Sequence, residues 1–541
     1  MSDKWQDYYQ QGTDRYISYY SDFVERFNSL LQPDIKRGRD HHKPRVRHEQ
    51  EERRLEGETL NAIEEERANV QEALRMAHTG RQWATLSNMA QILVTFFDRR
   101  GYWDDWILTQ RLVLDTVPRR GRTQIIGVAY NNMGSAYIAA SQWGKAKRYL
   151  GLALKYFHEN GDIENEGRTL TNLGIVNAEQ GHIKEAIKYY EKDLEICRKI
   201  HDIQGEAATL GNLAHAYRDS GRWDDSVRVF TEVLKIFKST GDRHSEAMTL
   251  NNLALVTEDI GKWDDAIRLY RQALEMRRAM GDQYTEGIIL ANMAGVYRKK
   301  GQWKPALEYY QQALKIYQKF NDKKGEVQVN SNMANALLRT GQIVRAIGYY
   351  QSALDSLHRI NDRSGEAQIL TNLGVAYQKQ GRFEESHRAL DGALSISREL
   401  EDHHGESSAL QNLGVTFEVE GNLSSALNCY RQSLRLKKKL GDHHGQGTAL
   451  VGLGNLAYKE RKLEKALDYY QQSLIIRKKL GDRYGEGLTL ANLGRMYLEL
   501  GKTKRATKYW QQSQNVLMEL DVPEAAEVAS WLKELEADND K

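Results

Sequence analysis

The sequence has very few cysteines and prolines. Two cysteines, Cys197 and Cys429, occur in 541 residues, and they lie far apart in dissimilar surroundings. We therefore expect no disulfide framework, and we expect a reducing, cytoplasmic location. Only five prolines interrupt the chain, which leaves long stretches without a helix breaker and favours helix nearly throughout.

Long apolar runs and a strong net charge are missing as well. No run of roughly 18 apolar residues occurs, so the sequence predicts no membrane span and no membrane partner. The N-terminus, MSDKWQDYYQQG, lacks the apolar core of a signal peptide. The 77 basic and 74 acidic residues leave a net charge of +3, which argues against a nucleic-acid partner.

The sequence is instead dominated by self-similarity. An aspartate recurs every 40 residues from Asp162 to Asp482, without an insertion or a deletion. A glycine keeps the same interval from Gly181 to Gly501 with one gap, and a small residue does so from Ala146 to Ala506. Three residue positions that recur at the same interval over ten units indicate a repeat array.

Each unit has the pattern of two helices. The aspartate can accept hydrogen bonds from the free amides of a first helical turn, and a glutamate four residues later, as in Asp202 and Glu206, favours the same helix end. The glycine tolerates the left-handed conformation that ends a helix. A second helix is predicted two or three residues later, with Pro305 in the first turn of one such helix.

The units resemble tetratricopeptide repeats. NLAHAYRDSGRWDDSV at 212–227 and NLGVAYQKQGRFEESH at 372–387 carry the resemblance. It implies an all-α fold, a right-handed superhelical solenoid of antiparallel helix pairs. The usual unit has about 34 residues. The 40-residue unit resembles the arrays of the LGN/Pins polarity scaffolds and the sensor region of bacterial STAND signalling ATPases.

Five segments are predicted along the chain. They are an N-terminal helical segment at 1–31, a charged linker at 32–58, a helical lead-in with one divergent repeat at 59–120, ten 40-residue units at 121–520, and a capping helix with a tail at 521–541. The linker is interpreted as mobile because it is dense in charge and holds two prolines. An arm that binds nucleic acid or lipid is the alternative for its basic part, 36–54.

The pentapeptide LTNLG occurs at 170–174 and again at 370–374, each time with an asparagine inside an apolar segment. Nine units carry this amide: Asn132, Asn172, Asn212, Asn252, Asn292, Asn332, Asn372, Asn412 and Asn492. On a helix, Asn172 falls opposite Leu170 and Leu173, so the amide belongs to a second face and not to the packing side.

The resemblance implies that first helices line the concave inside of the superhelix, and hence that the amides form a ladder along a groove. It is similar to the asparagine ladder that grips peptide backbone in the O-GlcNAc transferase superhelix, and to an asparagine in the carboxylate clamp of chaperone adaptors. An amide can donate to and accept from one peptide group. The alternative is that each amide bonds to a neighbouring helix or to ordered water.

Charged residues are predicted on the same face. The basic candidates for ligand contact are Lys299, Arg339, Lys379 and Lys459, with Arg298 and Arg495 beside them. Acids hold the equivalent sites elsewhere: Glu179, Asp219, Asp259 and Glu499. The middle of the groove, 281–400, is therefore predicted to be basic and to favour a ligand with an acidic segment. An ordinary mixed-charge surface is the alternative.

Other chemistry finds no support in the sequence. The phosphate-loop pattern GxxxxGK[ST] is absent, and no nucleophile–base or paired-carboxylate constellation stands out, so no enzyme is predicted. The pairs His403-His404 and His443-His444 do not point at one ion, so no metal and no other cofactor is predicted.

The predicted function is that of a protein–protein interaction scaffold or adaptor, which binds an extended peptide or partner segment in the concave groove. The alternative is a ligand-sensing regulatory module of a STAND-type signalling system whose ATPase domain is lost or supplied by another chain. RNA binding would need a basic concave stripe, which the acidic first units do not offer.

Overall fold

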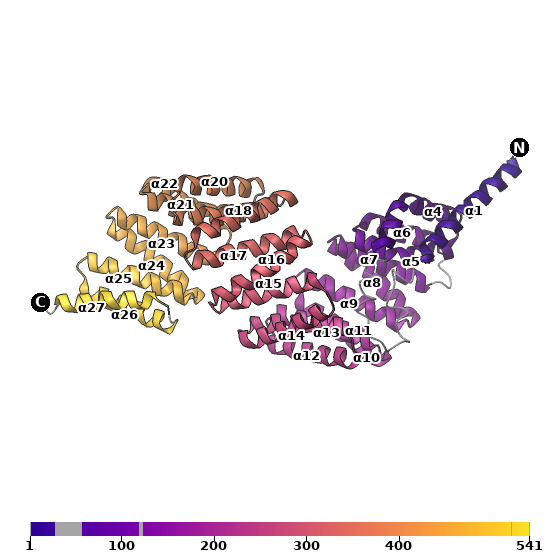
Figure 1. Cartoon of the computed structure of the whole chain (residues 1–541), viewed down its shortest axis with the longest axis horizontal. Helices are drawn as coiled ribbons and strands as arrows, with labels where there is room; N and C mark the ends of the chain where they lie inside the picture. The colour runs from indigo at the N-terminus through magenta and orange to yellow at the C-terminus, as the bar shows by residue number, and fades with distance from the viewer. Residues whose placement is uncertain (1, 28–56, 118–122, 521, 540–541) are drawn as a thin grey trace. The chain divides into compact units, whose positions relative to one another are not determined.

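The computed structural model describes residues 2–27, 57–117, 123–520 and 522–539. These residues form helices and no strand, so the predicted all-α repeat fold is confirmed. The chain divides into two compact units, Met1–Ile289 (unit 1) and Leu290–Lys541 (unit 2). Within each unit, successive helices lie side by side in pairs (Figure 1).

Unit 1 begins with α1 (Ser2–Arg26), which packs against α4 and α5 through the buried side chains of Ile17, Tyr20 and Val24. A further helix covers 57–65. The predicted linker at 32–58 lies outside the described residues, except for its last two positions. The other helices of unit 1 are α4 (Arg67–Thr79), α5 (Trp83–Arg100), α6 (Trp103–Thr116), α7 (Thr123–Ala139), α8 (Trp143–Asn160), α9 (Ile163–Glu179), α10 (Ile183–Ile200), α11 (Ile203–Asp219), α12 (Trp223–Thr240), α13 (Arg243–Asp259) and α14 (Trp263–Ala279).

The division between the units falls inside α15 (Gln283–Lys299). Unit 2 continues with α16 (Trp303–Lys319), α17 (Lys323–Arg339), α18 (Ile343–Ile360), α19 (Arg363–Lys379), α20 (Phe383–Glu399), α21 (His403–Glu420), α22 (Leu423–Lys439), α23 (His443–Lys459), α24 (Leu463–Leu480), α25 (Arg483–Glu499), α26 (Thr503–Glu519) and α27 (Glu524–Asn539). The final helix α27 packs Val528 and Leu532 into a cluster with Trp510 and Leu517 of α26, so it covers apolar surface of the last repeat.

The recurring aspartates cap first helices, as predicted. Asp362 Oδ1 accepts a hydrogen bond from the backbone N–H of Gly365 at 2.9 Å, and Asp202 accepts one from Gly205 at 2.9 Å. Each cap satisfies an amide that has no partner within its own helix. The glycine after the first helix adopts the left-handed conformation, with φ of 86° at Gly421. Local chemistry thus sets the boundaries of the repeat unit.

The glycine of the Leu-Gly motif permits close packing of the two helices of a unit. A Cβ atom added to Gly454 in α23 would lie 2.6 Å from Cε1 of Tyr470 in α24, which is closer than a real contact allows. Tyr470 is buried, and its hydroxyl donates to Asn455 Oδ1 at 2.7 Å. The motif therefore makes room for a large aromatic ring from the second helix.

Candidate functional site

The candidate site is the row of nine asparagines predicted from the sequence, here called the asparagine row. Every member lies on a first helix and is half-buried, whereas the leucine or methionine that follows it is buried. Asn172, for example, is half-buried and Leu173 is buried. The row therefore occupies a partly exposed face, but its members differ in the bonds that they form.

Two amides of unit 1 contact the preceding first helix. Asn172 Nδ2 donates to Asn131 Oδ1 at 3.1 Å and lies 3.4 Å from Ser135 Oγ, both on α7. Asn252 Nδ2 lies 3.4 Å from His215 Nε2 on α11. Burial lowers the pKa of His215, which keeps its ring neutral near pH 7. These two amides thus serve contacts between repeats.

In unit 2 most members of the row form no side-chain hydrogen bond within the described residues. Asn332 on α17, Asn372 on α19 and Asn492 on α25 form no side-chain hydrogen bond with any residue that the structure describes. Asn412 differs, because its Nδ2 donates to the backbone oxygen of Ser408 at 3.0 Å within its own helix. Asn292 takes part in a contact as well. Asn132 and Asn212 in unit 1 also lack a side-chain hydrogen bond among the described residues.

The predicted cations also divide into members that form a contact and members that do not. Lys459 Nζ lies 3.0 Å from Glu418 Oε1, and the Arg495 guanidinium lies 5.6 Å from the centre of the Trp531 ring. Lys299 is engaged in a contact, and Arg298 has a buried Nε that lacks a hydrogen-bond partner among the described residues. Two further cations, Arg339 and Lys379, are exposed and form no ion pair or side-chain hydrogen bond within the described part of the chain.

Two of the predicted acids are neutralised by neighbours. Asp259 Oδ2 accepts from Arg218 Nε at 2.6 Å, which joins α13 to α11. Glu499 accepts from the Tyr458 hydroxyl at 3.0 Å and pairs with Arg461 at 3.2 Å. Glu179 and Asp219 are exposed and form no ion pair with a described residue. The face therefore combines paired charges with four exposed charges that have no partner, of which the two cations lie on α17 and α19.

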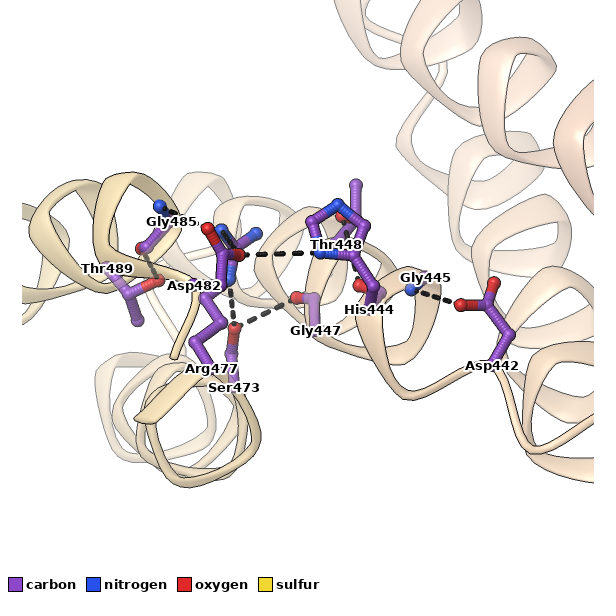
Figure 2. Close-up of polar contacts among 10 residues, drawn as sticks. All are labelled: Asp442, His444, Gly445, Gly447, Thr448, Ser473, Arg477, Asp482, Gly485 and Thr489. Carbon is purple, nitrogen blue, oxygen red and sulfur yellow. Dashed lines mark hydrogen bonds and ion pairs between the residues drawn. The ribbon is translucent and has the colours of Figure 1, made fainter. Parts of the chain in front are cut away.

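The structure also shows a polar cluster that sequence reasoning did not find, at the junction between two repeats (Figure 2). Arg477 of α24 is only 11% exposed, and its Nη1 lies 3.1 Å from Oδ2 of the capping residue Asp482. Its Nε donates to Ser473 Oγ at 3.2 Å, and Ser473 Oγ donates to the backbone oxygen of Gly447 at 2.9 Å. His444 Nδ1 lies 3.5 Å from the same Asp482 oxygen. Burial lowers the pKa of Arg477.

The same arrangement recurs in unit 1, where Arg277 Nη1 lies 3.1 Å from Asp282 Oδ2 and 2.8 Å from His244 Nδ1. The signal in the sequence is a cation five residues before the capping aspartate, at a position where other units have Phe157 or Phe237. These clusters lie on buried junctions and not on the asparagine row, so they support the fold and not the candidate site.

Three further observations concern the described residues only. No group of three or more histidine, cysteine or acidic side chains gathers there in a way that could hold a metal ion. Both cysteines are buried free thiols, and burial raises the pKa of Cys197 to about 12. None of the described helices combines the length and the apolar character that crossing a bilayer requires.

Comparison with known protein families identifies the repeats. A family model described as tetratricopeptide repeat matches residues 126–199, 205–279, 285–359, 365–439 and 445–519. Each match covers two units, and together the matches cover more than half of the chain. The chain belongs to the tetratricopeptide repeat family. This confirms the resemblance noted in the sequence, and a tetratricopeptide repeat array is a protein-interaction module.

Solved structures similar to this tetratricopeptide repeat chain include a signal transduction ATPase with numerous domains and a tetratricopeptide repeat sensor, from Pyrococcus horikoshii. That match has 13% identity and a TM-score of 0.49, and it covers 82% of this chain and 74% of the other. The apo quorum sensor NprR from B. thuringiensis has 14% identity, a TM-score of 0.45, and coverage of 63% and 99%. No curated protein sequence matches the chain.

Proposed function

We propose that this chain is an adaptor or scaffold that binds an extended segment of a partner protein along the asparagine row, with its main contacts on α17 and α19. One observation carries the proposal. The amides of Asn332 and Asn372 are half-exposed and have no side-chain hydrogen bond within the described residues, and the same two helices carry the exposed cations Arg339 and Lys379.

A free amide suits a peptide backbone. It offers two donors and an acceptor, and it carries no charge to desolvate. Neighbouring helices pack roughly 10 Å apart, and an extended chain rises about 3.3 Å per residue. Successive amides of the row would therefore meet the ligand at about every third residue, and they would read its main chain and not its side chains.

The two cations add a preference for charge. Arg339 and Lys379 each lie seven residues after the amide on the same helix, which is two helical turns. Because neither is neutralised by a described residue, both are available to a carboxylate of the ligand. The proposed ligand is therefore an extended segment that carries acidic residues, and its association should weaken with salt.

The test uses a peptide selected on the wild-type chain from a display library. We expect Asn332→Ala with Asn372→Ala to weaken the affinity about 5- to 150-fold, at about 0.5–1.5 kcal/mol for each lost hydrogen bond. Asn172→Ala is the matched control, because that amide is already bonded to Asn131. Equal affinities of the double variant and the wild type in calorimetric titration would show that the amides do not bind the ligand.

A further inference from the structure

The outer side of α22 differs from the rest of the chain in its charge. Residues 423–439 contain Arg431, Arg435, Lys438 and Lys439 on the exposed side and no acidic residue at all. The chain as a whole has a net charge of only +3. The four cations, here called the α22 basic face, are therefore a local concentration of charge and not a reflection of composition.

The four side chains share one side of the helix. At about 100° per residue they fall within an arc of about 100°, opposite the buried residues Ala426, Tyr430 and Ser433. From Arg431 to Lys439 they span about 12 Å along the helix axis. A partner that lies along α22 can thus reach all of them at once.

None of the four cations is neutralised within the described part of the chain, since none forms an ion pair or a side-chain hydrogen bond there. In other units the cation at the position of Lys438 forms an ion pair. The equivalent Arg198 and Arg398 lie 2.7 and 2.8 Å from Glu206 and Glu406 of the next first helix.

In the first helix that follows Lys438, α23, the residue equivalent to Glu206 and Glu406 is Gln446. Its side chain is turned inward, and its Nε2 donates to the backbone oxygen of Lys437 at 3.2 Å. The position that holds an acid at other junctions holds a neutral residue here, so Lys438 has no carboxylate partner among the described residues.

The second helix of the following repeat, α24, also ends in exposed basic residues. Tyr469 of α24 packs against the apolar cluster that contains Tyr430 of α22. The last turns of α24 carry the exposed residues Lys478 and Lys479, and Ile475 one turn earlier is 68% exposed. Lys478 lies 3.8 Å from Glu486. A large aliphatic side chain thus stands exposed on the second helix of the following repeat.

We propose that the α22 basic face is a second docking surface, which takes an acidic helical segment of a partner protein. Cations spaced by three and four residues match carboxylates that recur every three or four residues on a facing helix. Ile475 offers an apolar contact of the kind found at the centre of protein interfaces. A nucleic-acid backbone would make no use of this side chain. The only aromatic residue of α22, Tyr430, is buried, so the helix offers no exposed ring on which a base could stack.

This surface is separate from the asparagine row. The row lies on first helices, whereas α22 and α24 are second helices. One chain can therefore hold an extended ligand and a helical partner at the same time, which is what a scaffold requires. The inference does not depend on the function proposed for the asparagine row.

The test uses a synthetic helical peptide with glutamates at every third or fourth position on one face and leucines beside them. A second peptide of the same composition has its glutamates spread around the helix. We expect the chain to prefer the first peptide, and we expect Arg431→Glu, Arg435→Glu, Lys438→Glu and Lys439→Glu together to weaken its binding about tenfold or more.

The matched control changes four exposed lysines of unit 1 that form no ion pair with a described residue: Lys184→Glu, Lys192→Glu, Lys199→Glu and Lys235→Glu. It carries the same change in net charge and should bind the peptide as the wild type does. The variant Asn332→Ala with Asn372→Ala should also bind it unchanged, which separates this proposal from the one for the asparagine row. Melting curves establish that each variant is folded.

Three outcomes would overturn the proposal. Equal affinity for the two peptides would show that the α22 basic face does not distinguish how the glutamates are arranged on the peptide. Tighter binding of a DNA duplex or of vesicles that contain phosphatidylserine would assign the surface to another class of partner. An equal loss of binding in the control variant would show an effect of net charge alone.

Discussion

Asn172 donates a hydrogen bond from Nδ2 to Asn131 Oδ1, 3.1 Å away on the preceding first helix. Asn372 stands 200 residues later in the same pentapeptide, LTNLG, but it has no such bond among the described residues. The reason lies one repeat earlier. The residue equivalent to Asn131 is Ser331, and the residue equivalent to Ser135 is Asn335, whose Oδ1 accepts from the Tyr350 hydroxyl at 2.6 Å.

The two copies of the pentapeptide should therefore respond differently to the same substitution. We expect Asn172→Ala to lower the stability of the repeats around it by about 0.5–1.5 kcal/mol, because a bond between helices is lost. Asn372→Ala should leave stability unchanged and weaken ligand binding. Hydrogen exchange resolved along the chain measures the first effect and titration the second. A clear loss of protection in Asn372→Ala would indicate that this amide has a structural role.

Arg477 and Asp482 form a buried ion pair, and removing one partner should change the stability differently from removing the other. Removing the carboxylate in Asp482→Ala leaves a buried guanidinium without its counter-charge, and we expect a loss of about 3–5 kcal/mol. Arg477→Leu should be close to neutral or stabilising, because Leu357 and Leu517 occupy the equivalent position in other units. Hydrogen exchange at the start of α25 reports both effects. If the two variants lost equal protection, the ion pair itself would be the stabilising element.

Lys437 makes stability depend on pH. It is 5% exposed, and burial lowers its pKa to about 8, against about 10.4 in an unfolded chain. Between these pH values the unfolded chain holds a proton that the folded chain has lost. The folded state should therefore become more stable as the pH rises from about 8 towards 10, and it bears the full cost of burying the charge below pH 8.

Lys437→Met should remove this dependence and stabilise the fold by about 2–3 kcal/mol at pH 7. Denaturant unfolding at several pH values between about 7 and 10 measures both quantities. Lys199→Met, at an exposed position, is the control and should keep the slope of the wild type. A slope in Lys437→Met as steep as in the wild type would show that another group is responsible.

Backbone strain at one junction can be relieved. Glu401 adopts φ of 54°, a left-handed conformation in which a side chain is unfavourable, whereas Gly381 adopts φ of 78° without that cost. We expect Glu401→Gly to stabilise its junction by about 1 kcal/mol and Gly381→Ala to destabilise its own by about as much. Melting temperatures that move in the same direction for both variants would contradict this.

Sequence reasoning was reliable where the relevant contacts are local. The capping of first helices by residues such as Asp362, and the left-handed glycine at Gly421, depend on residues a few positions apart and could be predicted. The pairing of Lys459 with Glu418 and the bond from Asn172 to Asn131 join residues about one repeat apart. Such contacts follow only once the packing of neighbouring helices is known, so the row was predicted but its free members were not.

The buried arginines were missed for a different reason. A cation at a core position contradicts the apolar pattern of the repeat, and Arg277 and Arg477 are tolerated only because an aspartate that already serves as a cap also faces them. The hydrophobic pattern alone contains no information about this second use of the aspartate.

The constant capping geometry makes the repeats interchangeable as genetic modules. Asn361 and Glu401 both adopt φ of 54°, and each is followed by a capping aspartate, Asp362 or Asp402. Excising 362–401 would join Asn361 to Asp402 with the backbone conformation that both junctions already have. Unequal recombination between such sites changes the gene by whole repeats and preserves both the reading frame and the capping geometry of the junction. The chain can thus gain or lose binding surface in increments of 40 residues, and selection then needs to alter only the side chains exposed on each copy.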